Sequence, residues 1–222
     1  MKKPMVDYRQ FRLSKLNTPE FSHLKLLGGW LVYFALYFLT ENLIPAERCH
    51  LVHSALDDAI PFHEGFIIPY CFWFLLIVIT LVWFLLYDVE SFKRFQVFII
   101  ITQAVAMIVY IVWPSVQDLR PTVFPRDNFL THVIAFIYRF DTPTGVCPSL
   151  HVAYSLGIAS CWCKCKKATP WWKAFVVLAA AVISIATAFV KQHSVIDIFA
   201  AIPLALLAEI LTFHVIYPKK RT

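Results

Sequence analysis

The chain has 222 residues, of which 59% are hydrophobic and 15% are charged, and its mean hydropathy is +0.67. Soluble domains are about half apolar and about a quarter charged, so this composition excludes an ordinary soluble domain. The net charge of +6 requires no nucleic acid partner, because basic loops facing an anionic inner leaflet account for it.

The chain begins with a polar segment, residues 1–23. It lacks the apolar stretch and the small-residue cleavage site of a signal peptide, so we predict a cytoplasmic N-terminal arm. Residues 24–218 are predicted to form one transmembrane domain. Residues 219–222 are predicted to be a basic cytoplasmic tail.

Apolar residues gather into runs of the length that a helix needs to cross about 30 Å of hydrocarbon. The runs are continuous rather than alternating, which favours helices over a β-barrel. We therefore predict an all-α polytopic membrane protein with six transmembrane helices and a short interfacial helix at 128–140. The fourth run is the shortest and the most polar. The expected spans are 26–44, 66–87, 95–113, 148–163, 172–190 and 195–217.

The basic residues predict the orientation of these spans. With both termini inside the cell, five of the twenty Lys and Arg residues lie outside and fifteen lie inside, as the positive-inside rule requires. The active face is then predicted to be extracytoplasmic, at the plasma membrane. The five outside residues are Arg48, Arg120, Arg126, Arg139 and Lys191.

The six cysteines give no clear framework. Cys161, Cys163 and Cys165 are spaced two apart and suit a tetrahedral metal poorly, although reversible acylation is an alternative. Cys49 and Cys147 both lie on the outer side, and whether they form a disulfide is open.

Basic side chains and histidines meet in two outer loops. Cations held beside histidines at one membrane face suggest a phosphate site, whereas the simpler interpretation is contact with lipid headgroups. The residues concerned are Arg120, Arg126, Arg139, His151, Lys191 and His193.

The segment 147–151 (Cys-Pro-Ser-Leu-His) opens the fourth span. Pro148 suits the first helical position, and the amides of Ser149 and Leu150 would then be free to bind an anion. His151 would lie one turn in, where it can give a proton to a leaving oxygen. The alternative is a span that begins at a proline and has an incidental polar turn.

His193 and Asp197 open the last span and lie four residues apart. On a helix they share a face, so the carboxylate can bind one imidazole nitrogen and leave the other as a nucleophile. An ionisable residue inside an apolar run is costly and is usually functional. The alternative is a carboxylate that caps the span and reaches outward.

These residues resemble motifs of the type-2 phosphatidic acid phosphatases, relatives of the vanadium haloperoxidases. Arg120-Pro121 looks like the end of the first motif of that family, and the segment 148–151 resembles its Pro-Ser-Gly-His motif with leucine for glycine. His193 and Asp197 match the end of the third motif. The resemblance covers most of the chain from about residue 57 onward.

The resemblance implies a phosphohistidine mechanism without metal or other cofactor. His193 would attack phosphorus, Asp197 would hold His193, and His151 would protonate the leaving alkoxide. The substrate would be a phosphorylated lipid in the membrane, and the sequence does not indicate the oligomeric state. The phosphate oxygens would be bound by Arg120 and by the backbone at Ser149 and Leu150.

Two family cations are absent from their usual places. Trp113 stands where the family has lysine, and Thr187 stands where it has arginine. Lys191 could replace one of them. The segments 191–193, 148–151 and 57–62 look more like the branch of inositol phosphorylceramide and sphingomyelin synthases.

The sequence is therefore compatible with three functions. The first is a lipid phosphatase acting on a phosphomonoester or pyrophosphate. The second is a lipid phosphotransferase that moves a phospho-headgroup to another lipid alcohol. The third is a non-catalytic lipid transporter or binding protein that keeps a degenerate site.

Overall fold

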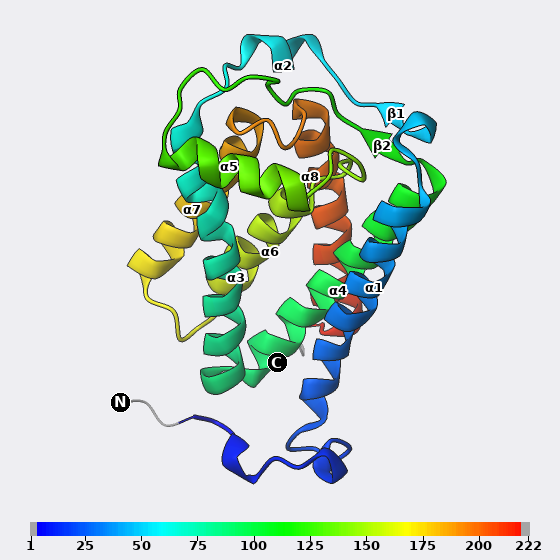
Figure 1. Ribbon diagram of the computed structural model, residues 1–222. Coiled ribbons are helices and arrows are strands. Elements are labelled where there is room, and N and C mark those ends of the chain that lie inside the picture. The colour runs from blue at the N-terminus through cyan, green and yellow to red at the C-terminus, as the bar shows by residue number, and fades with distance from the viewer. Residues whose placement is uncertain (1–3, 219–222) are drawn as a thin grey trace.

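The computed structural model describes residues 4–218, which form an all-α bundle (Figure 1). The predicted basic tail at 219–222 lies outside the described residues. A 3₁₀ turn, Ser22–Leu27, leads into the first long helix, and a π-helical segment, Leu211–Ile216, extends the last one. In chain order the helices and strands are α1 (Gly28–Leu43), β1 (His50–Leu51), α2 (Ala55–Ala59), α3 (Ile67–Tyr87), α4 (Val89–Val112), β2 (Ser115–Val116), α5 (Phe129–Phe140), α6 (Leu150–Lys164), α7 (Pro170–Phe189) and α8 (Val195–Ile210).

Five helical stretches within residues 4–218 are long and apolar enough to cross a membrane. The chain is accordingly a multi-pass integral membrane protein, as its composition predicted. These stretches correspond to five of the six expected spans, and α6 is the remaining one. The five are Ser22–Leu43, Glu64–Tyr87, Val89–Val112, Pro170–Phe189 and Val195–Ile216.

The predicted start of the third span, residue 95, is wrong, because α4 already begins at Val89. Asp88 caps it, with Oδ1 accepting a hydrogen bond from the Ser91 amide at 3.3 Å. The first turns carry the Glu90–Arg94 ion pair, 3.2 Å long, on one face of the helix. Hydropathy misses such turns because their residues are charged, although capping and ion pairing favour a helix there.

The helix α6, which lies at the expected fourth span, is the central helix of the bundle and packs against α4, α7 and α8. Its 15 residues extend about 22 Å, which is less than the bilayer core of about 30 Å. Ser149 is the N-cap, so the expectation that Pro148 occupies the first helical position is wrong. At Gly157 an added Cβ would lie only 2.4 Å from Phe98 Cε1, so glycine permits the close approach of α4 and α6.

Short elements cover one end of the bundle. There β1 pairs in parallel with β2, and α2 and α5 lie across the helix ends (Figure 1). The helix α5 is the short helix expected at 128–140, capped by Asn128, whose Oδ1 accepts from the Thr131 amide at 3.1 Å. We call this end, with α2, β1, β2 and α5, the loop end.

The N-terminal arm lies at the opposite end (Figure 1). The Met5 amide donates to the Leu86 carbonyl at 2.8 Å, and Tyr8 Oη lies 2.8 Å from Nε2 of the buried His23. The arm is therefore attached to the far end of α3. This leaves the loop end as the place where the predicted site residues converge.

Candidate active site

Asp197 and His193 meet at the start of α8. Asp197 Oδ2 accepts the Ser194 amide at 3.0 Å and lies 3.2 Å from His193 Nδ1. The predicted contact is present, but the shared helical face is not its cause. His193 precedes the N-cap residue Ser194, and the capping box turns the carboxylate back toward the imidazole.

His151, in the first turn of α6, completes a chain of three side chains. Its Nδ1 lies 3.3 Å from His193 Nε2. Its ring lies against two aromatic rings of α3, with centroid distances of 4.6 Å to Tyr70 and 4.1 Å to Trp73. These contacts hold the imidazole in place, and its Nε2 has no hydrogen-bond partner among the described residues.

This arrangement can perform nucleophilic and acid chemistry. A proton on His193 Nδ1, directed at Asp197, leaves a lone pair on Nε2. His151 lies beside that lone pair and can carry a proton to a departing oxygen. Asp197 is fully buried, so its orientation is fixed by the fold.

Ser149 does not offer the free groups that the sequence predicted. Its amide donates to the Asp197 carbonyl at 3.1 Å, and its Oγ accepts from the Val152 amide at 3.4 Å. The expectation of a free Ser149 amide is therefore wrong. The bond between the Ser149 amide and the Asp197 carbonyl joins the start of α6 to the first turn of α8, and so links the two segments that carry the histidines. Leu150 lines a cleft in front of the two histidines.

Arg120 reaches Gln192, the residue before His193; its Nη1 and Nη2 groups have hydrogen-bond partners, whereas its buried Nε has none among the described residues. Its guanidinium donates to the carbonyls of Tyr138, Asp141 and Thr142 at 2.7–3.2 Å and to Gln192 Oε1 at 2.5 Å. Burial lowers the pKa of this guanidinium, and the charge of Asp141 partly offsets that effect. The residue joins α5 and the following loop to the turn before α8, rather than lining the cleft as a phosphate ligand.

Lys191 is likewise directed away from the cleft. Its Nζ donates to the carbonyls of Asp57 at 2.8 Å and Ile60 at 2.5 Å, and its backbone has φ of 53°. Burial lowers the pKa of the ammonium, and the carboxylates of Asp57 and Asp58 oppose this. The expectation that Lys191 replaces a missing phosphate cation does not agree with this geometry.

Asp57, which the sequence did not single out as a site residue, caps α8 from a distant part of the chain. Its Oδ2 accepts from Ser194 Oγ at 2.6 Å, and its Oδ1 accepts from the Val195 amide at 2.8 Å. Burial opposes ionisation, but the hydrogen bonds from Ser194, Val195 and Ser54 outweigh it and lower the pKa of Asp57. Together the Asp57 and Lys191 contacts form a clamp between α2 and the start of α8.

The sequence contained one signal for Asp57, the capping pattern Ser54-x-x-Asp57. That pattern indicates only that a helix starts there and does not indicate a contact with α8.

A cleft of about 570 Å³ lies in front of the two histidines. Aromatic side chains from α1, α3, α4, α5 and α6 form about half of its lining. Among residues 4–218, no lysine or arginine lines it, and Asp141 is its one carboxylate. Its aromatic lining includes Trp30, Tyr33, Tyr37, Tyr70, Trp73, Tyr110 and Tyr154.

The cleft is lined by residues of α1 and α3 and by Phe136, Ile137 and Phe140 of α5. Several lining residues are half or more exposed there, namely Phe34 (56%), Phe74 (54%) and Phe136 (61%). None of the residues of α1 is buried, and this helix packs mainly on α4. The mouth of the cleft is therefore bordered by exposed apolar side chains.

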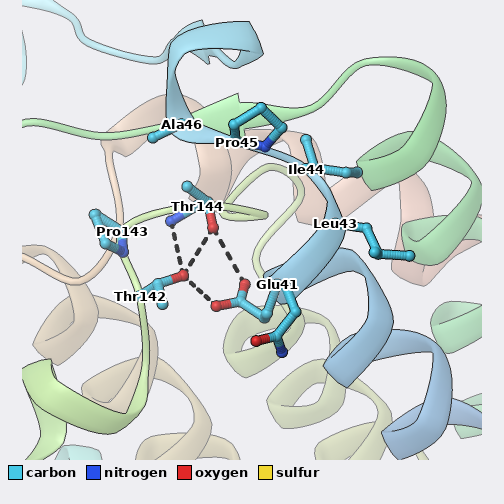
Figure 2. A pocket seen from close by; sticks show the side chains of 9 residues that line it. Glu41, Leu43, Ile44, Pro45, Ala46, Thr142, Pro143 and Thr144 are labelled. Atoms are coloured by element: carbon cyan, nitrogen blue, oxygen red, sulfur yellow. Dashed lines mark hydrogen bonds between the residues drawn. The ribbon is translucent and has the colours of Figure 1, made fainter.

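A second hollow, of about 460 Å³, lies where α1 ends (Figure 2). The carboxylate of Glu41 accepts hydrogen bonds from Thr142 Oγ1 and Thr144 Oγ1, the latter at 3.2 Å. These bonds attach α1 to the loop between α5 and α6. The hollow has no histidine, lysine or arginine in its described lining, so the aromatic cleft is the stronger candidate.

No protein-family model, curated protein or solved structure matches this chain. The resemblance to the type-2 phosphatidic acid phosphatases therefore stays a prediction. It depends on the segment 148–151 and on the pair His193 and Asp197.

Proposed function

We propose that this protein is a membrane enzyme that cleaves a phosphoester bond of a lipid through a phosphohistidine at His193. The observation that supports it is the chain Asp197–His193–His151, with contacts of 3.2 and 3.3 Å, at a cleft whose mouth is bordered by exposed apolar side chains. A soluble phosphate ester would not require an opening bordered by apolar side chains. A lipid can enter it from the bilayer and place its phosphorus beside both imidazoles.

The proposed first step is an in-line displacement. The lone pair of His193 Nε2 forms a bond to phosphorus while the bond from phosphorus to the lipid oxygen breaks. His151 gives its proton to that oxygen, which leaves as an alcohol. Asp197 stabilises the charge on His193. An incoming hydroxyl then attacks phosphorus, His151 takes back its proton, and His193 is released.

Water as the incoming group makes the enzyme a lipid phosphatase that acts on a phosphomonoester or pyrophosphate. A second lipid alcohol makes it a headgroup transferase. One observation favours this second form: no lysine or arginine lines the described cleft, whereas the dianion of a phosphomonoester would need such cations. A phosphodiester carries only one negative charge.

Incubation of the purified protein in detergent with ³²P-labelled lipids tests the proposal. We expect labelled phosphate or a labelled new lipid, together with an acid-labile label on the protein that His193→Ala abolishes. Asp58→Asn, which changes an exposed carboxylate outside the cleft, is the matched control. A wild-type protein that binds these lipids but never carries label would instead be a non-catalytic transporter or binding protein.

We also propose that both termini are cytoplasmic and that the loop end is extracytoplasmic, at the plasma membrane. The support is the distribution of basic residues, fifteen of twenty being on the proposed inner side. The substrate would then be a lipid of the outer leaflet.

A further inference from the structure

We infer that Trp73 is a positioning residue for the proposed acid: the face of its ring, together with that of Tyr70, stabilises the positive charge of His151. The inference rests on the proposed function and deepens it, because it names the residues that keep the general acid charged beside an apolar cleft. Both residues belong to α3, lie about one turn apart and line the cleft. Their effect on the reaction passes through the imidazole.

The surroundings of His151 make a charged imidazole costly. Its Nδ1 lies 3.3 Å from His193 Nε2, and its buried Nε2 has no hydrogen-bond partner among residues 4–218. No carboxylate within that range therefore hydrogen-bonds this ring, since Asp197 reaches the other nitrogen of His193 instead. The titratable groups that face the ring are His193 and, from α3, Tyr70. Burial disfavours the charged form of a histidine, so an acid at this position needs another source of stabilisation.

The two rings of α3 provide that stabilisation. The imidazole centroid lies 4.1 Å from that of Trp73 at an interplanar angle of 35°, and 4.6 Å from that of Tyr70 at 29°. The planes are closer to parallel than to perpendicular, so each ring presents its face to the imidazole. The face of an aromatic ring is negative, and tryptophan is the strongest partner for a cation within about 6 Å of its centroid. Both rings therefore favour a proton on His151.

Trp73 is the better probe of the two rings. Its indole Nε1 has no hydrogen-bond partner among residues 4–218, so it acts on His151 through its ring. Tyr70 has a second contact, because its Oη accepts a hydrogen bond from Gln192 Nε2 at 3.4 Å in the turn before α8. A change at Tyr70 would therefore disturb the nucleophile as well as the acid. Trp73 also stacks on Tyr154 of α6, with centroids 5.6 Å apart, which fixes the plane of the indole.

The proposed charge stabilisation matters at one chemical event. An N–H bond of the His151 imidazolium breaks while the O–H bond of the departing alcohol forms, and the ring becomes neutral. Loss of the Trp73 ring should reduce the fraction of His151 that carries this proton. The reaction of a lipid, whose alkoxide needs the proton, should therefore slow. The reaction of a p-nitrophenyl phosphodiester, whose nitrophenolate leaves without a proton, should change little.

Steady-state kinetics of Trp73→Leu and Trp73→Phe test the inference. On the lipid we expect Trp73→Leu to lower kcat/KM about tenfold at about pH 7, the size of one desolvated cation–π contact. The alkaline limb of its pH profile should move to lower pH, because the acid loses its proton earlier. On the p-nitrophenyl phosphodiester the loss should stay within about twofold. Trp73→Phe keeps an aromatic face and should retain most of the activity on the lipid.

Trp30→Leu is the matched control. Trp30 lines the same cleft from α1 and stacks on Tyr154, but within residues 4–218 its ring has no contact with that of His151. A loss of packing or of lipid binding should leave the alkaline limb in place, as we expect for this variant. Growth on 5-fluorotryptophan weakens the negative face of Trp73 without changing its shape, so it serves if Trp73→Leu does not fold. It should move the limb in the wild-type sequence and not in Trp73→Phe.

The charge of His151 can also be measured without turnover. The ¹⁵N shifts of histidine-labelled protein at about pH 6, assigned with His151→Ala, report its protonated fraction. That fraction should fall in Trp73→Leu and stay at the wild-type level in Trp30→Leu.

Equal losses on the two substrates, with the alkaline limb unmoved in Trp73→Leu and in the fluorinated protein, would overturn the inference. If the protonated fraction falls as expected but the wild-type protein never forms phosphohistidine, the proposed reaction alone fails. Phosphohistidine formation with an unchanged protonated fraction in Trp73→Leu refutes only the inference.

Discussion

His151 and His193 have separable roles in the proposed reaction, because only one of them protonates the leaving group. Loss of a general acid typically costs about 10²–10⁴ in rate, but a leaving group of low pKa needs little protonation. We therefore expect His151→Ala to lose most of its activity on a lipid and to recover it largely on p-nitrophenyl phosphate or a p-nitrophenyl phosphodiester.

His193→Ala should be inactive on every substrate, because no bond to phosphorus can form. Asp197→Asn should lose activity on both substrate types, since it acts through His193. Steady-state rates of the three variants on both substrates check this. Equal losses for His151→Ala on the lipid and the nitrophenyl ester would contradict the assigned acid role.

His53 provides a pH-dependent contact at the loop end, outside the spans. Its hydrogen bonds to Asp118 at 2.8 Å and to Asp58 at 3.0 Å raise its pKa. A raised pKa means that protonation stabilises the folded state. That stabilisation is complete below the unfolded pKa of about 6.5 and is lost as the pH rises through the folded pKa.

We accordingly expect the thermal midpoint of the wild-type protein to exceed that of His53→Gln at about pH 5–6, and this difference to shrink as the pH rises through the folded pKa of His53 and the imidazole loses its proton. Differential scanning fluorimetry in detergent across this range measures the difference. A gap that grows toward alkaline pH would contradict the ion-pair assignment.

At the scale of elements, the clamp between α2 and α8 positions the candidate nucleophile. Asp57 caps the first turn of α8, and Lys191 satisfies two carbonyls of the α2 segment. Loss of one partner of a buried hydrogen bond lowers the free energy of unfolding by about 1–3 kcal/mol. We expect Lys191→Met and Asp57→Asn each to have an effect of this size.

The double variant should lose less free energy of unfolding than the two single variants lose together, because both contacts join the same two segments. Lys191→Met should also lower kcat with little change in KM, since the side chain does not touch the cleft. A large increase in KM alone would instead support a direct contact with phosphate. Denaturant unfolding and steady-state kinetics provide the two measurements.

At the scale of the whole molecule, the native cysteines can report the proposed orientation. Cys49, a partly exposed free thiol, lies at the loop end, and Cys163, which is exposed, lies near the opposite end of α6. In right-side-out vesicles a membrane-impermeant maleimide should label a Cys49-only variant and not a Cys163-only variant. Permeabilised vesicles should show both labels. The reverse pattern in intact vesicles would invert the topology.

The limits of prediction are clearest at particular residues. The apolar runs defined the helical spans, because the bilayer requires about twenty apolar residues per crossing. The start of α4 was missed, since its first turns are charged and depend on the Asp88 cap. The pair His193 and Asp197 was found from spacing, although the capping box rather than the helical face brings it together.

The sequence by itself determined the membrane class, the helical bundle and the candidate histidines, because these follow from hydropathy and from local spacing. Only the tertiary structure decided how Arg120, Lys191 and Asp57 are used. Their partners lie on segments far away in the chain; the Lys191 ammonium and the Asp57 carbonyl, for example, are 134 residues apart. A local pattern cannot indicate whether a cation faces a cleft or a backbone carbonyl, because packing of distant segments fixes its partners.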